Sequence, residues 1–278
     1  MRKLLTVLVI ALLVVAMTVP AGAAENAKSW GKVPVAGDPI KIDGEMDPIY
    51  ALGLQIKMGL PFNADATTGA NGVGYVLWNG TDTLYVYCTV VDKEVLKTTA
   101  SANAWDKDSV EVFIDYSNKN ARTRDQYRVD VANVGTYYAT STITEKLGDY
   151  GFTAWGSKIT DDGYAVEFEI KAYNEKISAG MNIGFDLQIN DMYKKNGAET
   201  RAVYNAYSSQ ESKGSADKYD FLTLDANVVK VPVETTAAAK AADKAPAAAA
   251  QTADMSVLCA IVSMAAVSGA ALSLKKRK

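Results

Sequence analysis

The sequence predicts an all-β domain, and specifically an antiparallel β-sandwich of jelly-roll-like form. Three observations support this fold class: many short stretches rich in β-forming or alternating residues, turn sequences between them, and the absence of long helical periodicity. The expected strands are 74–78, 84–90, 110–115, 126–131, 136–140, 164–170 and 183–190. Turn sequences stand at 79–82, 118–120, 161–163 and 195–197.

The N-terminal end, residues 1–24, has the features of a signal peptide. Met1-Arg2-Lys3 precedes an apolar run from Leu4 to Val19, and small residues follow up to Ala24. A basic segment, an apolar segment and small residues before a cleavage site are typical of secretion. The alternative interpretation is a retained membrane anchor.

The C-terminal end predicts attachment to a cell surface. Residues 235–254 form an Ala-rich linker, and residues 255–278 form a transmembrane or sorting segment whose apolar stretch ends in a basic tail, Lys275-Lys276-Arg277-Lys278. This arrangement resembles the sorting signals of Gram-positive surface proteins, although the segment 251–254 lacks the usual Pro and Gly. Sortase attachment to the cell wall and a plain membrane anchor therefore stay open. In either case we expect an extracellular, cell-surface-anchored protein.

The remaining segment, 25–234, suits one domain with a real core. The net charge of −3 gives no indication of a nucleic-acid partner. The chain has no histidine, which excludes a Ser-His-Asp triad, a Cys-His pair and histidine-ligated zinc or haem. Cys88 alternates with apolar residues and is expected to be a buried, reduced core residue, since the other cysteine, Cys259, lies in the apolar C-terminal segment.

One face of three predicted strands carries polar side chains. Alternation places Glu111 on the face opposite Val110 and Val112, Arg128 on the polar face of 126–131, and Gln188 and Asn190 together on 183–190. Trp105 lies on the loop directly before the first of these strands. An indole ring can stack on the apolar face of a sugar, and carboxylate, guanidinium and amide groups can bind its hydroxyls. The alternative is a cross-strand Glu111–Arg128 salt bridge with Gln188 simply exposed.

Several segments, taken in order, resemble the family nine carbohydrate-binding modules, which are DOMON-like sugar-binding domains. They are Ile42-Asp43-Gly44 with the acids and aromatic that follow up to Tyr50, the hairpin of 76–78 with 84–86, 105–115, 126–129 and 184–191. The resemblance implies a β-sandwich that binds sugars without catalysis and carries structural Ca²⁺. It also implies that Trp105 is a stacking tryptophan, with Glu111, Arg128 and Gln188 as polar contacts.

The chain departs from this family where a second stacking tryptophan is expected. The segment 201–213 contains no Trp, and Tyr204 or Tyr207 is the candidate replacement. The calcium ligands are also unassigned. Acid-rich spots at Asp43/Glu45/Asp47, Asp106/Asp108 and Asp161/Asp162 could hold Ca²⁺, or could be ordinary turns.

We therefore expect a non-enzymatic protein that binds a glycan, either a plant-type polysaccharide or its oligosaccharides, at the cell surface. One alternative is a structural or adhesive surface protein that keeps the fold and has lost sugar binding. Another is a glycoside hydrolase that uses Glu111 with Glu167 or Glu169, which would need two carboxyl groups roughly 5–10 Å apart across a cleft.

Overall fold

The computed structural model describes residues 29–62, 69–118, 125–139, 142–144, 147–173, 175–207 and 220–232. They all belong to one compact unit that ends at Pro232. The predicted signal peptide, Ala-rich linker and C-terminal anchor lie outside the described residues. Within the described ranges, no helix has the length and apolar character needed to cross a membrane.

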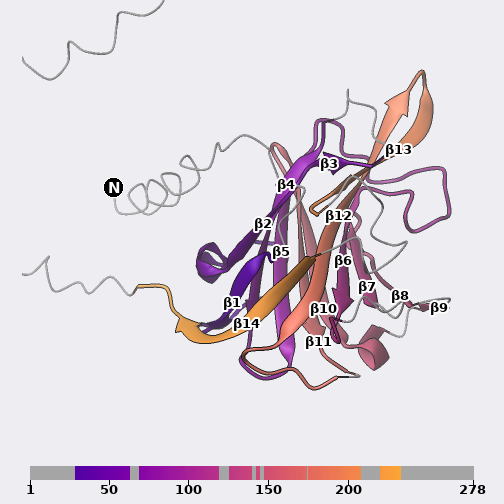
Figure 1. Cartoon of the computed structure of the whole chain (residues 1–278). Helices are drawn as coiled ribbons and strands as arrows, with labels where there is room; N and C mark the ends of the chain where they lie inside the picture. The colour runs from indigo at the N-terminus through magenta and orange to yellow at the C-terminus, as the bar shows by residue number, and fades with distance from the viewer. Residues whose placement is uncertain are drawn as a thin grey trace, which may run out of the picture. The chain divides into compact units, whose positions relative to one another are not determined.

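The described residues form strands and two short 3₁₀ helices (Figure 1). The strands are β1 (Gly31–Ala36), β2 (Leu54–Met58), β3 (Leu60–Pro61), β4 (Asn71–Trp78), β5 (Thr83–Val91), β6 (Ser109–Asp115), β7 (Asp125–Asp130), β8 (Gly135–Ala139), β9 (Thr142–Thr144), β10 (Phe152–Thr160), β11 (Gly163–Lys171), β12 (Asn182–Lys195), β13 (Ala198–Asn205) and β14 (Asp220–Val229). The 3₁₀ helices are η1 (Pro48–Leu52) and η2 (Leu147–Tyr150).

The strands follow one hydrogen-bonded path in the order β10-β11-β5-β4-β1-β14-β12-β6-β7-β8-β9. Strand β1 pairs in parallel with β14 and with β4, and so joins two sheets. We call β10, β11, β5, β4 and β2 the first sheet, and β14, β12, β6, β7 and β8 the second sheet. Strand β13 extends the second sheet beyond β12.

The two sheets face each other across a shared apolar core. The Tyr164 hydroxyl of β11 donates to the Ser109 carbonyl oxygen of β6 at 3.3 Å. Gly74 of β4 lies so close to Leu187 of β12 that an added Cβ would come within 2.3 Å of its Cδ1 atom. This is the predicted β-sandwich, and each fully buried large apolar side chain contributes about 1.5–3 kcal/mol to its stability.

Alternation along the strands explains which side chains fill this core. Val110, Val112 and Ile114 of β6 all point inward, as predicted, and join one buried cluster with residues of the first sheet. Cys88 is fully buried in this cluster and is a free thiol, which confirms the sequence prediction. Burial raises the pKa of the Cys88 thiol well above its ordinary value.

All seven predicted strands are present, and the hairpin turns match the turn sequences at 79–82, 161–163 and 195–197. The turn sequence at 118–120 extends outside the described residues. The strand predicted for 126–131 ends at Asp130, because the Asp130 carboxylate accepts hydrogen bonds from the backbone N–H groups of Ala132 and Val134, both at 2.9 Å, and stabilises a turn. In the β12–β13 turn, Asn196 and Gly197 have φ values of 52° and 83°, the left-handed conformation that such tight hairpins use.

Candidate functional site

The predicted polar residues come together on the outer face of the second sheet. Strand register places Gln188 of β12 beside Glu111 of β6, Glu111 beside Arg128 of β7, and Arg128 beside Thr136 of β8. The next row on the same face begins with Asn190, which lies beside Ser109. The alternation in the sequence therefore predicted this grouping correctly, because antiparallel strands in register bring equivalent faces together.

The Glu111 carboxylate is the centre of a hydrogen-bonded network, which we call the Glu111 network. Arg128 donates to Glu111 Oε1 through Nε at 2.7 Å and through Nη2. Asn190 Nδ2 donates to the same oxygen at 2.8 Å, and Gln126 Nε2 donates to the other. Gln188 Nε2 then donates to Asn190 Oδ1 at 3.2 Å.

The orientation of every amide in this network follows from the carboxylate. An ionised carboxylate only accepts hydrogen bonds, so Gln126 and Asn190 must turn their NH₂ groups toward Glu111. Asn190 then presents its oxygen to the NH₂ group of Gln188. The carbonyl oxygens Gln126 Oε1 and Gln188 Oε1 are left buried, with no hydrogen-bond donor among the described residues. Buried polar atoms are almost always hydrogen-bonded, so these two oxygens are unsatisfied acceptors on the face of the network.

The network lies deeper than a simple surface patch. Glu111 and Gln188 are each 1 % exposed, and Arg128 is 7 % exposed. The alternative interpretation, a Glu111–Arg128 salt bridge with Gln188 exposed, is therefore correct about the ion pair and wrong about Gln188, which is buried. Burial of Gln188 follows from its central position on β12, which has β6 on one side and β13 on the other.

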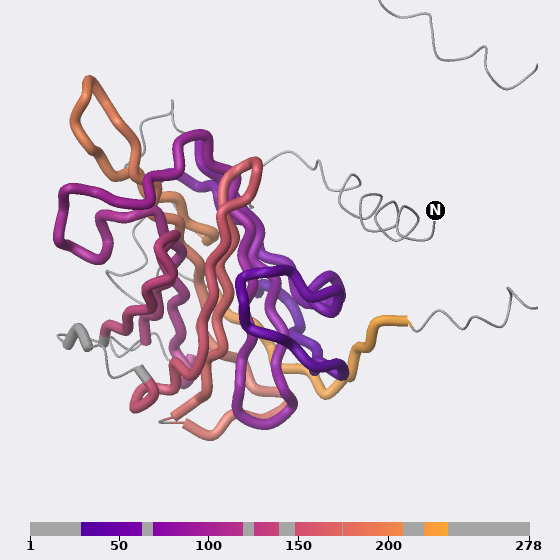
Figure 2. Tube along the Cα trace, turned by 180° about the vertical axis from the view of Figure 1, so that it is seen from behind, coloured from indigo at the N-terminus to yellow at the C-terminus, as the bar shows by residue number. Residues whose placement is uncertain are grey.

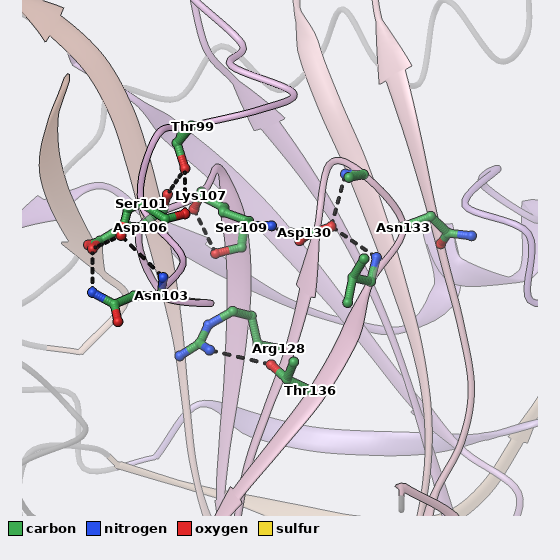
Figure 3. Close-up of polar contacts among 12 residues, drawn as sticks. Thr99, Ser101, Asn103, Asp106, Lys107, Ser109, Arg128, Asp130, Asn133 and Thr136 are labelled. Carbon is green, nitrogen blue, oxygen red and sulfur yellow. Dashed lines mark hydrogen bonds and ion pairs between the residues drawn. The ribbon is translucent and has the colours of Figure 1, made fainter. Parts of the chain in front are cut away.

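Trp105 lies on the loop from Asp92 to Asp108, between β5 and β6, and is partly buried. Side chains of the same loop hold it in shape, as Figure 3 shows for Asp106. Asp106 Oδ2 accepts hydrogen bonds from Ser101 Oγ at 2.8 Å and from Asn103 Nδ2 at 3.0 Å. Thr99 Oγ1 donates to the Asp106 carbonyl oxygen at 2.6 Å. Hydrogen bonds within the loop therefore fix the conformation of the segment that carries the indole ring.

The two candidate second aromatic residues lie on different sides of the second sheet. Tyr204 points into the core, is 3 % exposed, and its hydroxyl accepts a hydrogen bond from the backbone N–H of Gly69 at 2.9 Å. That position excludes Tyr204 as a stacking surface. Tyr207 is partly buried, packs against Phe113 and meets the ring of Trp30 edge-on, with centroids 6.2 Å apart. Phe113 lies on the same face of β6 as Glu111, so Tyr207 is on the side of the network.

The carboxylate pair considered for a glycoside hydrolase is not a pair. Glu167 points away from the core on β11 in the first sheet, where it accepts hydrogen bonds from Tyr50 Oη at 2.8 Å and from the backbone N–H groups of Asp43 and Gly44, both at 2.9 Å. Glu169 lies on the same face of β11. Glu111 points outward from the second sheet, so the apolar core separates it from both residues.

Among the described residues, one group of three carboxylates could hold a metal ion. Asp92, Asp108 and Asp191 offer oxygen atoms that all lie within 4.8 Å of one another. Asp92 Oδ2 is buried and has no hydrogen-bond donor among the described residues. Burial raises the pKa of Asp108 to about 8, while N–H groups of Met192 and Leu96 act in the opposite direction. Three carboxylates offer hard oxygen ligands and negative charge, which fits Ca²⁺.

The other acid-rich spots named from the sequence are turns. Lys41 forms an ion pair with Asp43 at 2.7 Å and donates its backbone N–H to Asp47, while Glu45 pairs with Lys158. Asp161 and Asp162 are exposed in the β10–β11 turn.

The sequence analysis named Asp108 but missed two of its partners and three members of the Glu111 network. The missed residues are Asp92, Asp191, Ser109, Gln126 and Thr136. The alternation does place Gln126 on the predicted polar face with Arg128, although no role was predicted for it there. No local pattern could group Asp92 with Asp191, because Asp92 follows β5 in the first sheet and Asp191 lies on β12 in the second.

Known proteins resemble this chain in sequence and in fold. A family described as carbohydrate family 9 binding domain-like matches residues 42–225. The chain belongs to this family. Endo-1,4-beta-xylanase A of Thermotoga maritima is 31 % identical over 166 residues, which is 57 % of this chain and 14 % of the xylanase. Endo-1,4-beta-xylanase C of Paenibacillus barcinonensis is 30 % identical over 154 residues, 54 % of this chain and 13 % of the enzyme.

The solved structures show the same fold. A family 9 module from Caldicellulosiruptor kristjanssonii, in complex with cellotriose, aligns with a TM-score of 0.55 at 24 % identity, over 73 % of this chain and all of the module. The same module in complex with glucose aligns equally well, over 72 % of this chain and 98 % of the module. The chain spans about a seventh of the length of the xylanases that it matches, so the family 9 domain is the part it shares with them.

Proposed function

We propose that this family 9 domain binds carbohydrate without catalysing a reaction, and that the sugar lies against the Glu111 network. The observation that carries the proposal is the pair of buried acceptors, Gln126 Oε1 and Gln188 Oε1. The Glu111 carboxylate fixes the direction of both amides. Sugar hydroxyls are donors that would complete these hydrogen bonds.

Each predicted residue has a distinct role in this proposal. Trp105 stacks on the apolar face of a sugar ring. Arg128 uses N–H groups that Glu111 and Thr136 leave free, since a guanidinium has five. Asn190 and Glu111 hold the amides in place, and Gln188 accepts from a hydroxyl. Tyr207 offers a second aromatic surface where the family has a tryptophan.

The glycan is proposed to be a β-1,4-linked plant-type polysaccharide or one of its oligosaccharides. Two observations favour it: the matched xylanases act on such a chain by name, and the structural neighbour was solved with cellotriose and glucose. We also propose that the mature protein is extracellular and anchored through residues after 234. Separate extraction of the cell membrane and the cell wall would tell a membrane anchor from sortase attachment.

We further propose that Asp92, Asp108 and Asp191 hold structural Ca²⁺. The ion would neutralise like charges that burial brings together. Asp92 and Asp108 stand at the two ends of the loop that carries Trp105, so the ion would close the base of this loop. Its role is structural, and no chemical step depends on it.

One observation favours the alternative, a structural or adhesive surface protein. The Glu111 carboxylate already has protein donors on both oxygens and is almost wholly buried. Such a network can stabilise a sheet without binding a ligand.

Isothermal titration calorimetry of the calcium-replete protein with glucose, cellobiose and xylobiose separates the two functions. Trp105→Ala removes the stacking ring, and Tyr85→Ala is a matched control on the outer face of the first sheet. Binding that Trp105→Ala weakens tenfold or more, and Tyr85→Ala leaves unchanged, supports carbohydrate binding. A folded wild-type protein that gives no heat with any of these sugars supports the alternative.

A further inference from the structure

A cavity of about 520 Å³ lies between the Trp105 loop and the β12–β13 hairpin, beyond the Glu111 network. Its lining includes Ser101 and Asp106 from the loop and Met192, Lys194, Glu199 and Arg201 from the hairpin. This volume is within the range of ordinary small-molecule sites.

The loop and the hairpin project side by side from the same end of the sandwich (Figure 1, Figure 2). Hydrogen bonds fix one against the other. The Ala100 N–H donates to Glu199 Oε2 at 2.7 Å, and the Lys194 N–H donates to Glu94 Oε2 at 3.4 Å. The two walls of the cavity are therefore held together by the protein itself.

The cavity continues the face that carries the Glu111 network. Gln188, Asn190, Met192 and Lys194 are alternate residues of β12 and so point to the same side of the strand. At the usual rise of a strand, Lys194 lies about 14 Å beyond Asn190. A linear ligand that starts at the network and follows β12 would reach this cavity.

The chemistry of the lining suits an uncharged ligand with many hydroxyl groups. The cavity has two cations and two carboxylates, so it presents both donors and acceptors without an excess of either charge. Ser101 and Asn103 donate to the Asp106 carboxylate, and Ala100 donates to Glu199. The Lys194 ammonium is exposed and has no carboxylate within 4.0 Å among the described residues, which leaves it available as a donor.

We propose that this cavity is a second sugar subsite, which binds a further residue of the same neutral glycan. The inference rests on the proposed function, because it takes the Glu111 network as the first subsite. The Lys194 ammonium donates to a hydroxyl of the second sugar, and Met192 forms part of the floor. Affinity then increases with chain length from a monosaccharide to a trisaccharide.

Calorimetry of the full-length, calcium-replete protein with glucose and with cellotriose tests this subsite. Lys194→Ala is the informative variant, because its side chain is exposed and makes no ion pair among the described residues. We expect it to weaken cellotriose binding about fivefold and to leave glucose binding unchanged. Lys195→Ala, one position along on the opposite face of β12, is the matched control and should change neither affinity. Thermal unfolding checks that both variants fold.

The other outcomes overturn the inference in distinguishable ways. If the wild-type protein binds both sugars equally, or if Lys194→Ala changes both affinities alike or neither of them, the second subsite is absent and the first remains. If the folded wild-type protein binds no sugar, the proposed function fails and this inference fails with it.

Discussion

The backbone N–H of Gly44 donates to the Glu167 carboxylate at 2.9 Å, across 123 residues of the chain. The N–H of Asp43 and the hydroxyl of Tyr50 donate to the same group, so Glu167 holds the turn that begins with Ile42. Gly44 has a φ of 80° and lies against Ser157, where an added Cβ would come within 2.8 Å of backbone. The Ile-Asp-Gly segment is therefore a structural anchor on the first sheet, on the side of the sandwich away from the Glu111 network.

Replacing Glu167 should affect stability and leave binding unchanged. In Glu167→Gln an NH₂ group replaces one carboxylate oxygen, so a buried N–H or hydroxyl loses its acceptor. We expect a loss of about 1–3 kcal/mol in the free energy of unfolding, measured with urea, and unchanged sugar affinity. A Glu169→Gln variant, changed on the same strand face but more exposed, is the control. Weaker sugar binding in folded Glu167→Gln would contradict the separation of the two faces.

The same residue should make stability depend on pH. Burial raises the pKa of Glu167 above 4.5, and hydrogen bonds from Gly44, Tyr50 and Asp43 offset part of that increase. A raised pKa means that the folded state binds the proton more tightly than the unfolded state. Protonation of Glu167 therefore stabilises the fold as pH falls through the folded pKa, and this gain is complete below 4.5. The unfolding free energy of wild type, relative to that of Glu167→Gln, should therefore increase as the pH is lowered from the folded pKa of Glu167 to below 4.5. A difference that is flat with pH would show that Glu167 does not titrate abnormally.

Breaking the Glu111–Arg128 pair should be costly. In Glu111→Ala the guanidinium of Arg128 stays buried without its carboxylate, and loss of one partner of such a pair typically costs about 3–5 kcal/mol. The double variant Glu111→Ala/Arg128→Met should lose less unfolding free energy than the sum of the losses in the two single variants. The reason is that the double variant leaves no buried charge. A double-mutant cycle by denaturant unfolding measures this coupling. Additive effects of the two changes would mean that the pair contributes no specific interaction.

Calcium removal should lower the melting temperature. At a free calcium concentration 100 times the dissociation constant, binding stabilises the folded state by about 2.7 kcal/mol, which is roughly 5–10 °C for a domain of this size. Chelation should produce this decrease in wild type by differential scanning fluorimetry. Asp92→Asn should abolish the calcium response, whereas Asp161→Asn, in an exposed turn, should keep it. An identical response in all three proteins would place the ion elsewhere.

Alternation was sufficient to predict that Glu111, Arg128 and Gln188 share one face of the second sheet, because a period of two decides on which side of a strand each residue lies. It could not predict how deeply they are buried, which depends on the neighbours of β12 and on the loops around it. Tyr204 and Tyr207 are three residues apart, an odd spacing that already places them on opposite sides of an extended chain. The grouping of Asp92 with Asp191 depends on how the first sheet packs against the second, for which no local pattern exists.

The position of β14 also has a mechanical consequence. Any pull applied after Pro232 enters the domain along this strand, whose hydrogen bonds run to β1 on one side and to β12 on the other. If the opposing load is a glycan held on β12, the force acts parallel to the strands, and the bonds on both sides of β14 share it in shear. Strands loaded in this direction separate only when many bonds break together, so a domain pulled in this way can resist the load without any disulfide.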